Sequence, residues 1–294
     1  MSDLDFLFEE LESADKVLVG AGAGLSAAAG LSYFDTAVFD KYYPDVRRLG
    51  YRCQYELVGI RDDEWSVGRK WAWWATHVNY VRYIFPAAEL YSKLLGLLEG
   101  KDYFVVTSNA DRQFMRSGID ENRLFEFQGN YDNMGCAERC TPHTWYNKPY
   151  LDRILEKLDH EKFECPDEAL PRCPYCGGLA EMCFRGEDYK ERREKYVDFV
   201  QSCEDKRLCI MELGVGFNTP GVIRWPFERI TYQLPKSHLF RINSGYKELR
   251  NDRGDNDIPP EISDRATFIG MDAAEVTERL CEMKKRAQTT TYGG

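Results

Sequence analysis

A glycine-rich turn near the start of the chain limits what this sequence can fold into. Residues 17–19 are apolar and predict a strand, glycines follow at positions 20, 22 and 24, and residues 25–30 are rich in alanine. Glycines let a backbone approach an anion closely, and the first N–H groups of a helix attract phosphate. Gly22-x-Gly24-x-x-Ala27 also fits the dinucleotide fingerprint, which allows alanine at its third position. The segment therefore predicts a strand, turn and helix that bind a diphosphate.

The region after this turn departs from an ordinary dinucleotide-binding domain. In that fold a second strand ends in Asp or Glu about twenty residues beyond the glycines. Residues 33–44 of this chain have no alternating strand pattern. A glycine run of this kind can also be a simple tight turn. If a dinucleotide binds here, we expect it to bind in a variant of the usual fold.

Charge and hydropathy exclude two classes of partner. The net charge is −10 and the sequence pI is close to 5.1, whereas a nucleic-acid surface needs clustered Lys and Arg. The sequence has no uninterrupted apolar run of about 18 residues, so no membrane span is expected. Residues 1–10 are acidic where a signal peptide would be basic. We predict a cytoplasmic protein that binds neither nucleic acid nor membrane.

Polar residues or glycines follow each further strand that the sequence predicts. Apolar runs at 103–107, 124–127, 208–213 and 238–242 predict strands, and a last strand at 266–269 leads into a helix at 272–286. Open α/β sheets bind ligands at the carboxyl ends of their strands. The sequence therefore predicts an α/β sheet whose candidate site residues include Ser108, Asn109, Asp111, Gln128, Gly214, Val215, Gly216 and Asn243.

Residues 35–99 are rich in tyrosine and tryptophan at spacings nearer to a helix than to a strand. This pattern predicts a helical insertion. Packing of helices on a core explains the aromatic residues best, and the lining of an apolar substrate channel is the alternative.

Six of the ten cysteines lie between residues 136 and 183. Cys136-x₃-Cys140 and Cys173-x₂-Cys176 have the spacing of two pairs that supply four thiolates to one structural Zn²⁺. Another residue could replace one of these ligands, the candidates being His143, Cys165 and Cys183. Redox chemistry at the second pair is the main alternative, although no βαβ setting with the pair at a helix start is evident.

Taken together, these motifs resemble the sirtuin family over nearly the whole chain. The family's glycine loop is similar to residues 22–26 with Gly30 downstream, and its Thr-Gln-Asn-Ile-Asp is similar to residues 107–111. Its paired cysteines match the two cysteine pairs, its Phe-Gly-Glu loop is partly kept at 185–187, and its Ile-Asn appears at 242–243. The order and spacing of five separated motifs agree.

The resemblance implies an inverted Rossmann-like parallel sheet with helices on both faces, a small zinc module and a helical insertion. The implied domains are an NAD-binding domain (1–34, 100–131 and 182–294), the insertion (35–99) and the zinc module (132–181). NAD would be a substrate whose nicotinamide–ribose bond is broken. By match, Ala23 and Asp111 would hold the nicotinamide amide, Asn109 the ribose, residues 214–216 the phosphates and Asn243 the adenosine ribose. The implied NAD-binding set is Gly22, Ala23, Gly24, Ser26, Tyr33, Ser108, Asn109, Asp111, Gln128, Gly214, Val215, Gly216 and Asn243.

Two departures from the deacylases of this family bear on the reaction. Gln128-Gly129 replaces their His-Gly, and residues 32–35 read Ser-Tyr-Phe-Asp in place of Pro-Asp-Phe-Arg. A histidine can take a proton near pH 7 and a glutamine cannot. Asn109 and Gln128 can still orient a cationic ribosyl species as hydrogen-bonding catalytic groups. The pattern resembles the microbial macrodomain-linked class M sirtuins, which implies protein ADP-ribosylation, a lipoyl-carrier protein related to the glycine cleavage H protein as target, and a macrodomain hydrolase as partner.

Other functions remain open at this point. A lysine deacylase is the family's commonest activity, and an inert sensor of NAD or ADP-ribose would bind the cofactor without releasing nicotinamide. A zinc-ribbon interaction protein is disfavoured, because it would not need the glycine loops. Asn109 could simply cap the following helix, and Gln128 could be a plain turn residue.

Overall fold

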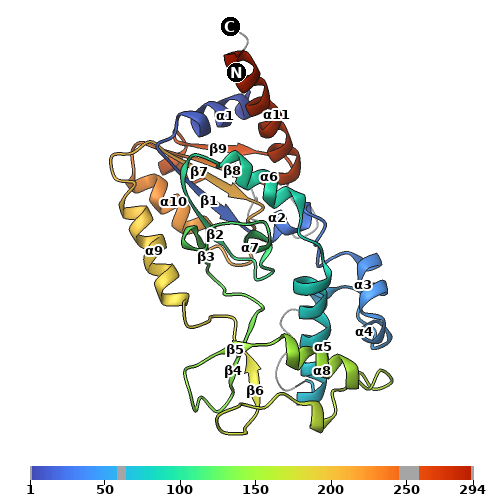
Figure 1. Cartoon of the computed structure of the whole chain (residues 1–294). Helices are drawn as coiled ribbons and strands as arrows, with labels where there is room; N and C mark the ends of the chain where they lie inside the picture. Colours follow the sequence, from blue (N-terminus) through green and yellow to red (C-terminus); the bar gives the residue numbers. More distant parts are fainter. Residues whose placement is uncertain (1, 58–63, 245–257, 293–294) are drawn as a thin grey trace. The chain divides into compact units, whose positions relative to one another are not determined.

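A six-stranded parallel sheet forms the centre of the first of two units in the computed structural model of this protein (Figure 1). The structure describes residues 2–57, 64–244 and 258–292. Unit 1 comprises Met1–Gly30, Ala87–Gln128 and Tyr189–Gly294, and unit 2 comprises Leu31–Pro86 and Gly129–Asp188.

The sheet of unit 1 has the strand order β3-β2-β1-β7-β8-β9. Every neighbouring pair is parallel, so the carboxyl ends of all its strands lie along one edge. The order reverses direction at β1, as in the sheets that bind dinucleotides. The strands are β1 (Lys16–Ala21), β2 (Asp102–Thr107), β3 (Leu124–Glu126), β7 (Leu208–Leu213), β8 (Ser237–Ile242) and β9 (Ala266–Ile269).

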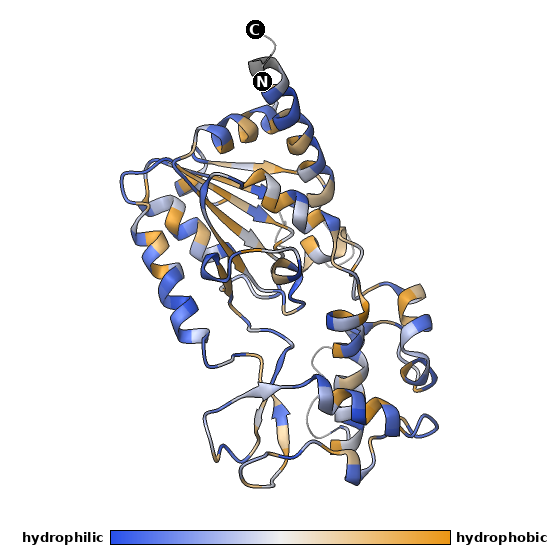
Figure 2. Ribbon diagram, viewed as in Figure 1, coloured by the Kyte–Doolittle hydropathy of each residue, from blue (hydrophilic) through white to orange (hydrophobic). Residues whose placement is uncertain are grey.

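The strands form because their sequences are short apolar runs that helices cover. All six residues of β7 are buried, as are the last five of β1. Figure 2 shows hydrophobic residues concentrated on the strands of this sheet. Parallel strands that are covered on both faces read as continuous apolar runs rather than as an alternation, which is what the sequence shows.

Helices cover both faces of the sheet (Figure 1). On one face, α9 packs against β2 and β3, and α10 packs against β8, over a shared apolar core. On the other, α11 packs against α1, α2 and α6. The helices of unit 1 are α1 (Asp3–Ser13), α2 (Ala23–Ala28), α6 (Glu89–Leu97), α7 (Gln113–Arg116), α9 (Tyr189–Gln201), α10 (Arg224–Gln233) and α11 (Ala273–Tyr292), with 3-10 turns η3 (Glu121–Arg123) and η6 (Pro260–Ile262).

Unit 2 combines short helices with a three-stranded antiparallel sheet of order β5-β4-β6. Helix α5 runs directly into a π-helical segment, η2, and packs against α8. The elements are α3 (Thr36–Tyr42), α4 (Pro44–Arg48), η1 (Gln54–Leu57), α5 (Val67–Val78), η2 (Asn79–Ile84), β4 (Asn133–Cys136), β5 (Trp145–Tyr146), α8 (Lys148–Lys157), η4 (Asp167–Ala169) and β6 (Ala180–Met182).

The predicted α/β fold with a parallel sheet is confirmed, and the last helix is longer than predicted. The last helix continues to Tyr292 rather than ending at 286, because no glycine or proline interrupts it before Gly293. Helix α6 groups with unit 1, whereas the sequence division places it in the helical insertion; that division stays a prediction. Within the part of the chain that the structure describes, no helix is long and apolar enough to cross a membrane.

Candidate functional site

The carboxyl edge of the large sheet gathers most of the predicted site residues. Residues directly after β1, β2, β7 and β8 lie at this edge. Gln128 lies two residues beyond Glu126, the last residue of β3. Because β1 lies between β2 and β7, the glycine turn after β1 is flanked by the segments that follow both neighbours. This edge of unit 1 is the candidate site, and the roles assigned to its residues stay predictions.

The glycine turn after β1 packs directly against the loop after β7. The Gly22 N–H donates to the Leu213 carbonyl (3.0 Å) and the Gly24 N–H to the Gly214 carbonyl (2.9 Å). A Cβ on Gly22 would lie 2.5 Å from the Gly214 oxygen, and one on Gly24 would lie 2.6 Å from the Gly214 Cα. We call this close approach of Gly22, Gly24 and Gly214 the glycine contact. Close packing against Gly214 is therefore a second reason for glycine at positions 22 and 24, besides the expected anion binding. The two hydrogen bonds also occupy two backbone N–H groups of the turn.

Ser26 on α2 joins the turn to the end of β2 through buried side chains. Its Oγ donates to the Asp111 carboxylate (2.6 Å) and lies 2.8 Å from the Tyr91 hydroxyl. Burial, together with the nearby Asp111 carboxylate, raises the pKa of Tyr91 well above its usual value, so this hydroxyl stays protonated. The Asp111 carboxylate also accepts the Gln113 N–H (3.0 Å). In the sequence, the place of Tyr91 in the aromatic stretch was the one sign of a role for it.

Asn109 is half-buried at the end of β2, and two hydrogen bonds fix it. Its Nδ2 donates to the Gly22 carbonyl (2.9 Å), and its backbone N–H donates to Thr107 Oγ1 (3.0 Å). Ser108, one residue earlier, donates its N–H to the Ala21 carbonyl (3.0 Å). The side-chain amide of Asn109 is therefore oriented by the glycine turn itself rather than by capping a helix.

Gln128 is exposed at the end of β3, beyond an ion pair that steadies the strand. Arg112 Nη1 lies 2.8 Å from the Glu126 carboxylate, whose side chain is buried. The Phe127 N–H donates to the Thr107 carbonyl (2.9 Å), which ties the segment to β2. The amide of Gln128 thus follows a fixed strand end while remaining open to a ligand.

The loop after β7 and the residue after β8 are also joined. Gly214 has φ +60°, a conformation that favours glycine, and its N–H donates to the Ile242 carbonyl (2.9 Å). Asn243 is buried, and its Nδ2 donates to the Val215 carbonyl (3.4 Å). Gly216 is exposed. The predicted phosphate-binding and ribose-binding segments therefore form one hydrogen-bonded group.

Tyr33 belongs to unit 2, where it contacts the buried His77. His77 Nε2 lies 3.4 Å from the Tyr33 hydroxyl and 3.3 Å from the Tyr131 hydroxyl. Its ring stacks on Trp73, with ring centroids 4.8 Å apart. Burial lowers the pKa of His77 to about 3, so the ring is neutral at physiological pH.

The four predicted zinc ligands meet at one point of unit 2. The sulfur atoms of Cys136, Cys140, Cys173 and Cys176 all lie within 4.8 Å of one another, with two pairs 3.6 Å apart. Four sulfurs at Zn–S distances of 2.3 Å around a tetrahedral ion would be about 3.8 Å apart, so these residues fit a structural zinc. None of the alternative ligands belongs to this cluster: His143 pairs with Glu187, while Cys165 and Cys183 donate to the carbonyls of Pro166 and Arg185.

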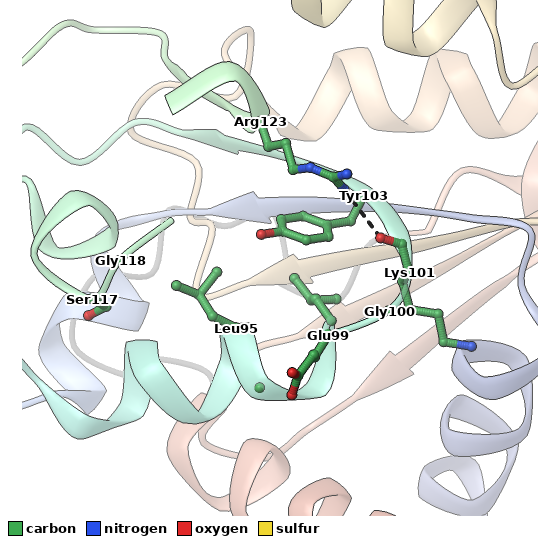
Figure 3. A pocket seen from close by; sticks show the side chains of 10 residues that line it. Leu95, Glu99, Gly100, Lys101, Tyr103, Ser117, Gly118 and Arg123 are labelled. Carbon is green, nitrogen blue, oxygen red and sulfur yellow. Dashed lines mark hydrogen bonds between the residues drawn. The ribbon is translucent and has the colours of Figure 1, made fainter. Parts of the chain in front are cut away.

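A separate cavity of about 560 Å³ opens near the amino end of β2 (Figure 3). The Arg123 guanidinium lies over the Tyr103 ring, 4.8 Å from its centroid, and donates to the Lys101 carbonyl (3.2 Å). No predicted site residue lines this cavity. It lies at the opposite end of β2 from Asn109 and Asp111 and is not part of the candidate site.

Two of the curated proteins that are similar in sequence are ADP-ribosyltransferases by name. The chain is 34% identical over 258 residues to a protein of Fusarium oxysporum f. sp. cubense described as a probable bifunctional ADP-ribose hydrolase/ADP-ribosyltransferase. It is 27% identical over 291 residues to a protein ADP-ribosyltransferase of Staphylococcus aureus. The matches cover 81% and 96% of this chain, and 42% and 88% of the relatives. The chain thus spans about two fifths of the fungal protein. No protein-family model matches the sequence.

Solved structures define the class of fold. The chain resembles a Sir2 homologue in complex with NAD at a TM-score of 0.60, with 17% identity and coverage of 96% of this chain and 94% of that one. A mutant Sir2 homologue in complex with ADP-ribose also gives 0.60, with 18% identity and 98% coverage of both. The fold, together with the four-cysteine cluster and the residues at the carboxyl edge of the sheet, thus defines an α/β protein of the Sir2 type. The chain belongs to the sirtuin family.

Proposed function

We propose that this chain is an NAD-dependent protein ADP-ribosyltransferase, which transfers the ADP-ribosyl group of NAD to a protein and releases nicotinamide. The observation that carries the proposal is the exposed amide of Gln128 after β3. Of the four histidines in the sequence, three lie in unit 2, and His238 lies near the start of β8 beside Thr267. The carboxyl edge of unit 1 therefore lacks an imidazole that could serve as a general base. The names of the fungal and staphylococcal relatives support the same activity.

The chemistry that NAD would supply is a nicotinamide–ribose bond whose cleavage leaves a cationic ribosyl group. Such a reaction depends on orientation and on electrostatic stabilisation more than on proton transfer. The hydrogen bond from Asn109 to the Gly22 carbonyl orients its amide in advance. Asp111, held by Ser26 and by the Gln113 N–H, is a fixed carboxylate suited to a nicotinamide amide. Gln128 would orient a ribose hydroxyl without taking its proton.

The acceptor that we propose is a lipoyl-carrier protein related to the glycine cleavage H protein. Its support is the resemblance of the sequence motifs to the macrodomain-linked sirtuins. We further propose a macrodomain hydrolase that removes the modification, supported by the ADP-ribose hydrolase activity in the name of the longer fungal relative.

Intact-mass measurement of carrier proteins after incubation with the full chain and NAD tests this function. We expect a mass gain of one ADP-ribosyl group on the lipoylated carrier, with release of nicotinamide. Replacing Asn109 by Ala should reduce the rate by about 10²–10³-fold, as loss of an oriented polar group in a transition state does. Asn122→Ala is the matched control, because Asn122 is an exposed amide of unit 1 near the amino end of β3.

Three other results would contradict the proposal. Turnover of acyl-lysine peptides without transfer would indicate a deacylase. Tight NAD binding without nicotinamide release would indicate a sensor. An equal loss of activity in the Asn109→Ala and Asn122→Ala variants would remove the special role of Asn109.

A further inference from the structure

Four charged side chains, three of them buried, form a cluster next to the loop that follows β7. Glu212 is the penultimate residue of β7, Arg241 is the penultimate residue of β8, and Arg224 and Glu228 lie on the first turns of α10. The side chains of Glu212 and Arg224 are fully buried and that of Arg241 is 1% exposed. We call these four residues the charge cluster. The predicted strand 208–213 contained the signal for it, a glutamate within an otherwise apolar run.

The charges in this cluster balance through direct contacts. Arg241 binds both carboxylate oxygens of Glu212, with distances of 2.8 and 3.2 Å, and its Nη2 also lies 2.7 Å from Glu228. Arg224 Nε lies 3.5 Å from Glu212 Oε1. Two positive and two negative groups therefore share one site, in which Glu212, Arg224 and Arg241 are buried and Glu228 is 16% exposed. Each would be costly to bury alone, and removing one partner leaves an uncompensated charge.

Stability alone explains this arrangement poorly. Buried ion pairs often contribute no more than well-packed apolar residues of similar volume. Arg224 is moreover the first residue of α10, where the helix dipole disfavours a positive charge. A cation kept at such a position indicates that its geometry serves another purpose.

Three members of the charge cluster lie next to segments of the candidate site. The Arg224 guanidinium lies 4.0 Å from the centroid of the Phe217 ring, which places a cation against the loop after β7. Glu212 precedes Gly214 by two residues, and Arg241 precedes Asn243 by two. Gly214 and Asn243 are themselves joined to the neighbouring strand and loop by hydrogen bonds.

We propose that the charge cluster positions the loop 214–217 and Asn243 for NAD, with Glu212 and Arg224 as positioning residues that do not touch the substrate. This inference rests on the proposed use of NAD. The glycine contact fixes one side of Gly214, and the charge cluster fixes the other end of the loop through Phe217. The loop is then already in its binding conformation before the substrate arrives, which lowers the ordering cost of binding.

The test compares Arg224→Met and Glu212→Gln with Arg279→Met, which removes an exposed cation paired with Glu275 on α11. NAD affinity is measured by calorimetry, amide exchange is measured for residues 214–218, and kcat and KM are measured for transfer. We expect the two cluster variants to weaken NAD binding by roughly 10- to 100-fold, equivalent to about 1.4–2.8 kcal/mol, because binding must then order the loop. Exchange should rise in 214–218 but not in β1 or β2, kcat at saturating NAD should change little, and Arg224→Lys should restore part of the affinity.

Two outcomes would overturn the inference alone. One is unchanged NAD affinity in folded Arg224→Met and Glu212→Gln proteins. The other is an equal rise of exchange throughout the sheet, which would indicate general destabilisation. If Arg224→Met does not fold, Glu212→Gln and Arg224→Lys decide by the same measurements. Failure of the wild-type chain to bind either NAD or ADP-ribose would instead overturn the proposed function, and this inference with it.

Discussion

The two units hold groups of polar side chains in opposite ways. In unit 1 the charge cluster balances itself, because two arginines meet two glutamates within the chain. In unit 2 four cysteine sulfurs converge within 4.8 Å of one another, a set of ligands that supplies up to four negative charges to one point. The first arrangement is complete with amino acids alone, whereas the second requires a metal ion. We infer that the amino acids of unit 1 are sufficient for its stability, whereas the stability of unit 2 also depends on bound zinc.

Removing zinc should produce the largest effect and should separate the two units. Structural zinc contributes about 10–16 kcal/mol in small zinc-finger peptides. In Cys173→Ser, or after chelation, we expect loss of bound zinc and of amide protection in β4 and β6, while β1 and β7 stay protected. Metal analysis together with hydrogen exchange measures both. Cys183→Ser is the control, because this cysteine of unit 2 lies outside the cluster. Full protection of β4 and β6 in metal-free protein would refute the difference between the units.

A methyl group at Gly214 should cause the next largest effect, this time in unit 1. Its Cβ would lie 2.4 Å from the Gly24 carbonyl carbon, and its φ of +60° disfavours alanine. The conformational cost alone is about 1–2 kcal/mol, and the backbone overlap adds to it. We expect Gly214→Ala to lower the free energy of unfolding of unit 1 by about 2 kcal/mol or more in urea titrations.

Gly216→Ala is the matched control for stability, since a Cβ there meets no atom within 4 Å. An equally stable Gly214→Ala protein would show that the loops after β1 and β7 can separate without cost, and the glycine contact would lose its significance.

Acid should weaken unit 2 through His77. Its pKa is about 3 in the folded protein and about 6.5 when unfolded, so the unfolded chain binds more protons between these values. The contribution of neutral His77 to the free energy of unfolding is therefore fully present above pH 6.5. Below pH 6.5 the free energy of unfolding falls by up to about 1.4 kcal/mol per pH unit. Among the residues that the structure describes, the hydroxyls of Tyr33 and Tyr131 are the groups within hydrogen-bond distance of its Nε2.

Melting curves of the wild type and of His77→Gln at pH 7.5 and 5.5 test this expectation. The wild type should lose more stability between the two pH values than the variant does. A wild-type curve that loses no more than the variant would mean that the folded ring can take a proton after all.

The sequence predicted the strands and the cysteine cluster well, because both leave local patterns. Strands β1, β2, β7 and β8 are buried apolar runs, found within one or two residues of their observed ends. Contacts between distant segments left no such pattern. The spacing of Ser26 and Tyr91 says nothing about their hydrogen bond, and Gly214 carried no sign that it packs on Gly24. Arg224 could not be recognised as buried, because arginine is usually exposed and its partner Glu212 lies on another element, twelve residues earlier in the sequence.

The glycine contact also sets an order of events during synthesis of the chain. β1 lies between β2 and β7, and the turn after β1 packs on Gly214. At 5–20 residues per second, the ribosome needs about 10–40 seconds for the roughly 190 residues from Gly24 to Gly214. Until then the first strand has only one of its two neighbours. The earliest part of the candidate site to be synthesised is thus among the last to take its final form, and a chain halted before β7 would present the unpaired edge of β1 in place of a binding site.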